Sequence, residues 1–208
     1  MIQNTTELIG PLESRIRRAI EQSDTEVASF DVFDTAVDRP FLEPKDLFHF
    51  YSRTAGELVD LSVADLGKWR IRAEAELRRE IEVKGHRRDP TLPEIYDRLE
   101  RDAGISRSHA ETLYRYEIEK EMQLLRPRYL TLRIYKFALS LNRRIVFISD
   151  TYFDRDTITK ILERSGYSGP HDLFISSEFK KTKKHGELFQ HVLRDLGVNG
   201  PAIVHVGD

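Results

Sequence analysis

The chain has 208 residues, and its 33 Lys and Arg against 35 Asp and Glu give a formal net charge of −2. This balance excludes a strong overall attraction to nucleic acid or to an anionic membrane surface, so we expect neither as a partner. The absence of cysteine excludes disulfides, thiolate catalysis and Cys-ligated zinc. Because the sequence has neither a membrane-spanning apolar run nor a secretory signal pattern, we expect a cytoplasmic protein.

The first two thirds of the chain are predicted to be helical around one short strand. An amphipathic helix is predicted over residues 5–22, and the segment "VASF" at 27–30 predicts a strand that runs into Asp31. Beyond it, a Ser or Thr with an acid three residues later marks several helix starts. The predicted helices cover 45–55, 62–85, 91–104, 108–126 and 128–141, with capping patterns at Ser62, Thr91 and Ser108.

The last third alternates between strands and helices. Short apolar runs, typical of strands buried on both faces, cover 144–149, 172–177 and 202–208, with helices predicted at 155–166 and 186–197 between them. This alternation indicates right-handed crossovers and a parallel sheet, and therefore an α/β fold. The helical stretch of about 42–127 is too long for one crossover, so we interpret it as a subdomain inserted over the strand ends.

Polar residues follow every predicted strand. They are Asp31, Ser149 with Asp150, Ser176 with Ser177, and Gly207 with Asp208. In open α/β sheets, ligands bind beyond the carboxyl ends of the strands, so we expect these endings to share one site.

Four of these segments, in order, resemble the motifs of the haloacid dehalogenase (HAD) superfamily. They are "FDVFDT" around Asp31, "VFISD" around Ser149, a lysine in "KTKKHGELF", and "VHVGD" ending in Asp208. The resemblance implies a Rossmann-like α/β core at 1–41 and 128–208 with a helical cap at 42–127. It also implies the strand order 3-2-1-4, in which the first strand is central.

The chemistry of the residues agrees with what the resemblance implies. A carboxylate attacks phosphorus when positive groups neutralise and orient the phosphoryl group, and Asp31 on a rigid strand end is the candidate nucleophile. Ser149 and Lys183 are expected to hold the phosphoryl oxygens, with Lys184 as the alternative lysine. The expected magnesium site comprises Asp31, Phe33 and Asp208. Thr35 and Asp150 complete the expected substrate-binding set.

The sequence departs from the family pattern in two places. Phosphatases of this kind usually have a second Asp two residues after the nucleophile, as a proton donor, and here that position is Phe33. Asp34 is the candidate substitute, although alternation along a continuing strand would turn it away from Asp31, and only a turn directly after Asp31 would bring it back. The alternative for Asp34 is a structural role or a place next to the ligands of the metal. The resemblance also implies a further acid, helix and strand beyond Asp208, so we expect a weak metal site at that end of the sequence.

These residues lead to one preferred function and two alternatives. The preferred function is Mg²⁺-dependent hydrolysis of a small phosphorylated metabolite, such as a sugar phosphate or a nucleotide, through an aspartyl-phosphate. A dehalogenase, which attacks carbon and needs no proton donor or metal, is the second enzyme class because an aromatic residue follows its nucleophile at the position of Phe33. The third interpretation is a HAD-fold module that binds a ligand or partner without turnover.

Overall fold

A computed structural model describes residues 10–41, 43, 45–59 and 66–207 of the chain. Its main sheet has four parallel strands in the order β5-β4-β1-β6, so the first strand is central, as predicted. Their bounds are β1 Val27–Phe30, β4 Arg144–Ser149, β5 Asp172–Ile175 and β6 Ile203–Val206. The α/β class and the order predicted from the sequence are therefore confirmed.

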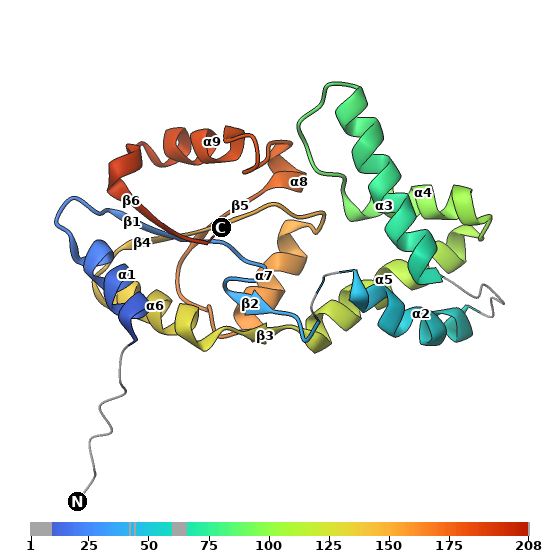
Figure 1. Cartoon of the computed structure of the whole chain (residues 1–208), viewed down its shortest axis with the longest axis horizontal. Coiled ribbons are helices and arrows are strands. Elements are labelled where there is room, and N and C mark those ends of the chain that lie inside the picture. The colour runs from blue at the N-terminus through green and yellow to red at the C-terminus, as the bar shows by residue number, and fades with distance from the viewer. Residues whose placement is uncertain (1–9, 42, 44, 60–65, 208) are drawn as a thin grey trace, which may run out of the picture.

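Helices cover both faces of this sheet, which explains why its strands are continuous apolar runs. Alternate side chains of the strands pack on α9 on one face, where Val146, Ile148 and Val192 belong to one buried cluster. The other face lies against α1, α6 and α7 (Figure 1). The bounds of these helices are α1 Pro11–Glu21, α6 Tyr129–Ser140, α7 Arg155–Arg164 and α9 Glu187–Leu196.

Two short elements flank the last strands. The segment predicted as a strand at 172–177 is a strand only to Ile175, because Ser176 and Ser177 open the one-turn helix α8, Ser176–Phe179. A 3-10 turn at Gly200–Ala202 leads into β6. Both serines are buried, so this departure from the predicted strand places two hydroxyl groups beside the carboxyl ends of the sheet.

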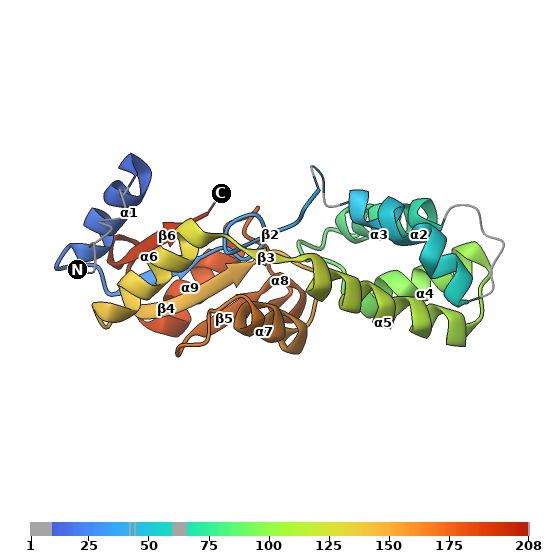
Figure 2. The ribbon, with the colours of Figure 1, turned by 90° about the horizontal axis from the view of Figure 1, so that it is seen from below.

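Four helices form a separate group at one end of the molecule (Figure 2). They are α2 Asp46–Leu58, α3 Leu66–Val83, α4 Leu92–Ala103 and α5 Arg107–Leu124, and they pack on one another. The chain leaves the sheet through β2, Val37–Asp38, and returns through β3, Arg126–Pro127, and these two strands pair antiparallel. The division into core and cap at 42 and 127 stays a prediction. Within the described residues, no helix has the length and apolar character needed to cross a membrane.

The helix-start patterns had different outcomes. The predicted capping box of α4 is present, because the Thr91 hydroxyl accepts from the Glu94 N–H and the Glu94 carboxylate accepts from the Thr91 N–H. The side chain of Ser106, two residues before the expected Ser108, caps α5. The pattern beginning at Ser62 lies outside the described residues.

A buried ion pair ties α3 to α5 inside the helical group. Arg70 donates to both carboxylate oxygens of Glu117 at 2.7 Å, and the two side chains are 2% and 0% exposed. The Tyr96 hydroxyl also donates to Glu117, at 2.7 Å. Aromatic rings of Phe48 and Tyr152 lie 4.5 and 5.0 Å from the Arg70 guanidinium. Because this pair is desolvated, each charge depends on the other.

We predict that Glu117→Ala destabilises the protein by about 3–5 kcal/mol, because the buried Arg70 guanidinium loses both bonds to Glu117 and keeps the contact with the less buried Glu74. Urea unfolding monitored by circular dichroism measures this loss. The matched control is Glu111→Ala on the same helix, whose partner Arg107 is 62% exposed, and we expect it to change stability by less than about 1 kcal/mol. Equal effects of the two substitutions would contradict the importance of the buried pair.

Candidate active site

Asp31 lies directly after the central strand and is 6% exposed. Its N–H donates to the Val206 carbonyl at 2.9 Å, and its own Oδ1 accepts from the Val32 N–H at 2.7 Å. Gly207 passes close by, since a Cβ placed there would lie 2.8 Å from the Asp31 Cβ. The backbone of two neighbouring strands therefore fixes this carboxylate, and only a glycine fits beside it.

Lys183 brings a positive charge to the Asp31 carboxylate. Its Nζ lies 2.8 Å from Asp31 Oδ2, and the two side chains are 12% and 8% exposed. Lys183 precedes α9, whereas Asp31 follows β1, so the contact joins segments far apart in the sequence. Of the two lysines considered from the sequence, Lys183 is the one for which the structure gives a contact with Asp31.

The Asp150 carboxylate holds the backbone of the segment that carries Lys183. It accepts the Lys183 N–H with both oxygens, at 2.8 and 2.9 Å, and the Lys184 N–H at 3.4 Å. Burial raises the pKa of the Asp150 carboxyl, and the Lys183 N–H partly offsets this effect. The sequence predicts substrate binding for Asp150, and the structure adds a role in placing Lys183.

The backbone turns immediately after Asp31, so strand alternation does not continue to Asp34. The Val32 carbonyl accepts from the N–H groups of Ala36 and Val37, at 2.8 and 2.9 Å, which closes a tight turn. Asp34 has φ 56° within it. As a result both Phe33 and Asp34 line the cavity that contains Asp31. The alternation argument against Asp34 fails for this physical reason.

This cavity has a volume of about 650 Å³ and receives side chains from the sheet and from the helical group. Ser149, which is 1% exposed, lines it together with Asp31 and Lys183. The sheet-side lining is completed by Phe33, Asp34, Arg39, Asp150, Thr151, Tyr152, Lys184 and Phe189, and α3 adds Glu74 and Arg78. Of the four strand endings singled out from the sequence, Asp31 and the pair Ser149 and Asp150 line this cavity, and Gly207 of the last ending lies beside Asp31. Ser176 and Ser177 are not among its lining residues. Asp208 lies outside the described residues.

Thr35, also predicted to bind substrate, lines a different cavity with Thr131 and His205. Its carbonyl accepts from the Thr131 hydroxyl at 2.6 Å. Asp34 borders both cavities, whereas Thr35 lines only the second of the two, and its substrate role stays a prediction.

Sequence reasoning missed Arg39, which lines the cavity and connects the core to the helical group. It forms bonds of 3.0–3.2 Å with both carboxylate oxygens of Glu121 on α5, and its guanidinium lies 4.4 Å from the centre of the Phe33 ring. Burial acts to lower the pKa of Arg39, but Glu121 raises it above its usual value. The only sequence signal was the basic residue in "DRPF", which does not reveal its distant partner.

The described residues do not by themselves make up the expected magnesium site. Within the described ranges, no group of three His, Asp or Glu side chains is placed to hold a metal ion. Phe33 can offer only its main-chain carbonyl, and Asp208 is not described. We therefore derive no chemical step through a metal.

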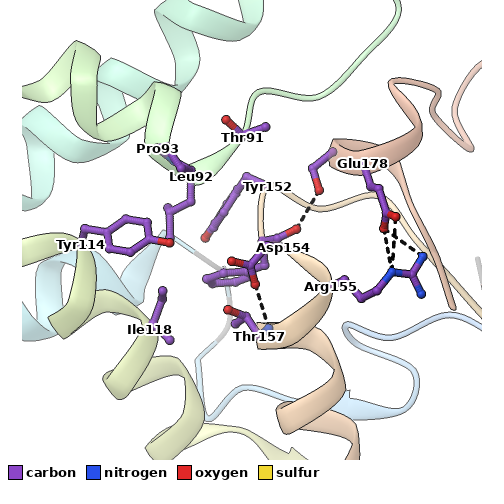
Figure 3. A pocket seen from close by; sticks show the side chains of 12 residues that line it. Thr91, Leu92, Pro93, Tyr114, Ile118, Tyr152, Asp154, Arg155, Thr157 and Glu178 are labelled. Carbon is purple, nitrogen blue, oxygen red and sulfur yellow. Dashed lines mark hydrogen bonds and ion pairs between the residues drawn. The ribbon is translucent and has the colours of Figure 1, made fainter. Parts of the chain in front are cut away.

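A second cleft of about 380 Å³ lies between α4, α5 and the start of α7 (Figure 3). Its walls are largely apolar, with Leu92, Tyr114, Ile118 and Phe153, and Tyr152 borders both this cleft and the cavity at Asp31. Asp154 caps α7 through the Thr157 N–H, and Arg155 pairs with Glu178. Among its described lining residues, no carboxylate directly after a strand pairs with a lysine, as Asp31 does with Lys183. The cavity at Asp31 is therefore the better candidate for chemistry.

Several solved structures of other proteins share the α/β fold of this chain. An L-2-haloacid dehalogenase from Xanthobacter autotrophicus with chloropropionic acid covalently bound matches with a TM-score of 0.53 and 11% identity, over 87% of this chain and 69% of that one. A predicted phosphoglycolate phosphatase from Haemophilus somnus 129PT matches with a TM-score of 0.55 and 10% identity, over 90% and 78%.

A 2-haloacid dehalogenase from Pseudomonas syringae pv. Tomato DC3000 matches with a TM-score of 0.53 and 22% identity, over 88% of this chain and 78% of that one. A scan of protein-family models and a search of curated proteins gave no match. The chain therefore shares its fold with these dehalogenases and with this predicted phosphatase, which is the fold that the resemblance implies. Identities this low establish the fold alone, and dehalogenases and a phosphatase share it.

We predict that Asp150→Ala loosens the segment that carries Lys183, because two backbone N–H groups lose their acceptor. Hydrogen exchange by mass spectrometry should be about 10-fold faster in peptides covering residues 180–186. Asp156→Ala, an exposed acid on α7, is the matched control and should leave this exchange unchanged. Unaltered exchange in the Asp150 variant would contradict the positioning role.

Proposed function

We propose that this chain is a hydrolase that transfers a phosphoryl group from a small phosphorylated metabolite of the cytoplasm to water, with Asp31 as the nucleophile. The observation that supports it is the 2.8 Å contact between Lys183 Nζ and Asp31 Oδ2 at the end of the central strand. A cation fixed there can neutralise a phosphoryl group as it approaches the carboxylate, and so lower the electrostatic barrier to attack by an anion.

The reaction proceeds in two displacements. An Asp31 oxygen attacks phosphorus as the bond to the substrate oxygen breaks, which forms an aspartyl-phosphate and releases the alcohol. Water then attacks the phosphorus of this intermediate and regenerates the Asp31 carboxylate with release of phosphate. Ser149 donates its hydroxyl hydrogen to a phosphoryl oxygen, and Lys183 neutralises charge in both steps.

Asp34 is the proposed proton donor of the first step. It lines the same cavity as Asp31, because the turn after the strand directs this part of the backbone to the site. Asp34 gives its proton to the departing alcohol oxygen and takes one from the attacking water in the second displacement. Phe33 cannot transfer a proton.

A magnesium ion at Asp31, Phe33 and Asp208 stays part of this proposal. When bound, it would supply further positive charge beside the phosphoryl oxygens. The steps above are assigned to the side chains alone.

A dehalogenase is the second candidate, and the observation that favours it is Phe33 in the cavity wall. A haloalkanoic acid has no leaving group that needs protonation, so Asp34 would be superfluous. The cavity of about 650 Å³ falls in the range that accommodates much larger ligands. The volume of the cavity and the presence of Asp34 in its lining therefore support the phosphatase.

We predict that the protein hydrolyses p-nitrophenyl phosphate and members of a phospho-metabolite panel with Mg²⁺, and that Asp31→Asn lowers the rate at least about 10³-fold because an amide is not a nucleophile. Released phosphate is the measurement. Asp172→Asn, which alters an exposed acid paired with Arg144 at the start of β5, should retain full activity.

Two other results would each contradict this function. Metal-independent release of halide from 2-chloropropionate, insensitive to EDTA, would indicate the dehalogenase. Binding of phosphorylated ligands without turnover, in the 208-residue chain and in one extended beyond Asp208, would indicate the binding module.

We further predict that Asp34→Asn has an effect that depends on the leaving group. Hydrolysis of alkyl phosphates, whose alkoxide needs a proton, should fall about 10²–10⁴-fold, whereas p-nitrophenyl phosphate, with an acidic leaving group, should lose less than about 10-fold. Steady-state kcat/KM for both substrates measures the difference. Equal losses would show that Asp34 is not the proton donor.

A further inference from the structure

We propose that Glu74 and Arg78, on α3 of the helical group, select a substrate whose body carries several hydroxyl groups, as in a sugar phosphate. This inference rests on the proposed function, because it assigns the phosphoryl end of the substrate to Asp31 and Lys183. It concerns the wall that α3 contributes to the same cavity.

The two side chains are held in fixed positions on one face of α3. Arg78 Nε donates to Glu74 Oε1 at 3.0 Å, and Arg78 Nη1 donates to Asp89. Asp89 is 6% exposed and accepts from the hydroxyl of Ser176, at the strand-end edge of the core. The helical group and the core together therefore position Arg78 at the cavity.

The charges around this wall compensate one another. Arg70 and Arg78 lie among three carboxylates, those of Glu74, Glu117 and Asp89. Burial acts to raise the pKa of Glu74, but the two guanidinium groups lower it below its usual value, so it is an ionised acceptor at neutral pH. With no excess positive charge, this wall offers little to a second anionic group of a substrate.

A hydroxyl group, by contrast, matches both side chains at once. It donates to a carboxylate oxygen of Glu74 and accepts from an N–H of Arg78, so adjacent hydroxyls of one sugar ring can bind in pairs. Phe33, Tyr152 and Phe189 line the same cavity and supply apolar surface for the ring carbons. A substrate of only a few atoms, bound at Asp31, would leave this wall without contacts.

Binding to the Asp31→Asn protein tests the inference without turnover. Calorimetric titration compares glucose 1-phosphate and glucose 6-phosphate with phenyl phosphate, which has no hydroxyl groups beyond the phosphoryl end. Adding Arg78→Gln is expected to weaken binding of at least one hexose phosphate about 10- to 100-fold and that of phenyl phosphate by less than about 3-fold. Arg78→Lys, which keeps the charge, should give an intermediate loss.

Arg72→Gln is the matched control, because Arg72 lies on the same helix and pairs with Glu76 but is 63% exposed and away from the cavity. It should bind all three ligands like the parent. Thermal melting shows whether each variant is folded. If Arg78→Gln is unfolded, the comparison of the three ligands is made with Arg78→Lys. A parent that binds no hexose phosphate, or equal losses for hexose and phenyl phosphates, would overturn the inference. Selective loss of binding without any turnover would support it while contradicting the proposed function.

Discussion

The contact between Lys183 and Asp31 depends on three independent features of the fold. The central strand delivers Asp31, the Asp150 carboxylate fixes the backbone of Lys183, and Gly207 leaves space for the Asp31 side chain. Each feature comes from the carboxyl end of a different parallel strand or from the loop that follows it. A site that draws on neighbouring strand ends is therefore as rigid as the sheet itself, which is the condition for electrostatic stabilisation of a transition state.

The helical group contributes to the same cavity through buried polar contacts. Arg39 reaches Glu121 on α5, and Asp89, in the loop before α4, accepts from Ser176 in the core. Burying such polar groups removes their hydration, and the bonds between them compensate this loss only when their geometry is good. These contacts therefore specify how the core and the helical group meet more than they stabilise the fold. Glu74 and Arg78 reach the cavity as part of this arrangement.

The core and the phosphoryl end of the site were predictable because their signals are local. Apolar runs ending in Asp31 and Ser149 identify buried strands and the edge where they meet. The turn that brings Asp34 into the cavity was not predictable, since it depends on a positive φ that Asp adopts only in a suitable context. Arg78 could not be predicted for another reason. The sequence of an amphipathic helix does not show whether a basic side chain faces a cavity or solvent.

The chain passes from the core to the helical group through β2 and returns through β3, and these two segments lie side by side because they pair. Arg39 follows β2 directly. The loop that carries Asp89 meets the core at a second place, near α8 (Figure 1). A rotation of the helices about this ribbon would thus have its pivot beside Arg39 and Glu121, and would act on the separate contact of Asp89 with Ser176. Such a rotation would separate Asp89 from Ser176 while the Arg39–Glu121 pair stays formed, so the Asp89–Ser176 bond would be the contact that holds α3 and its two cavity residues against the core.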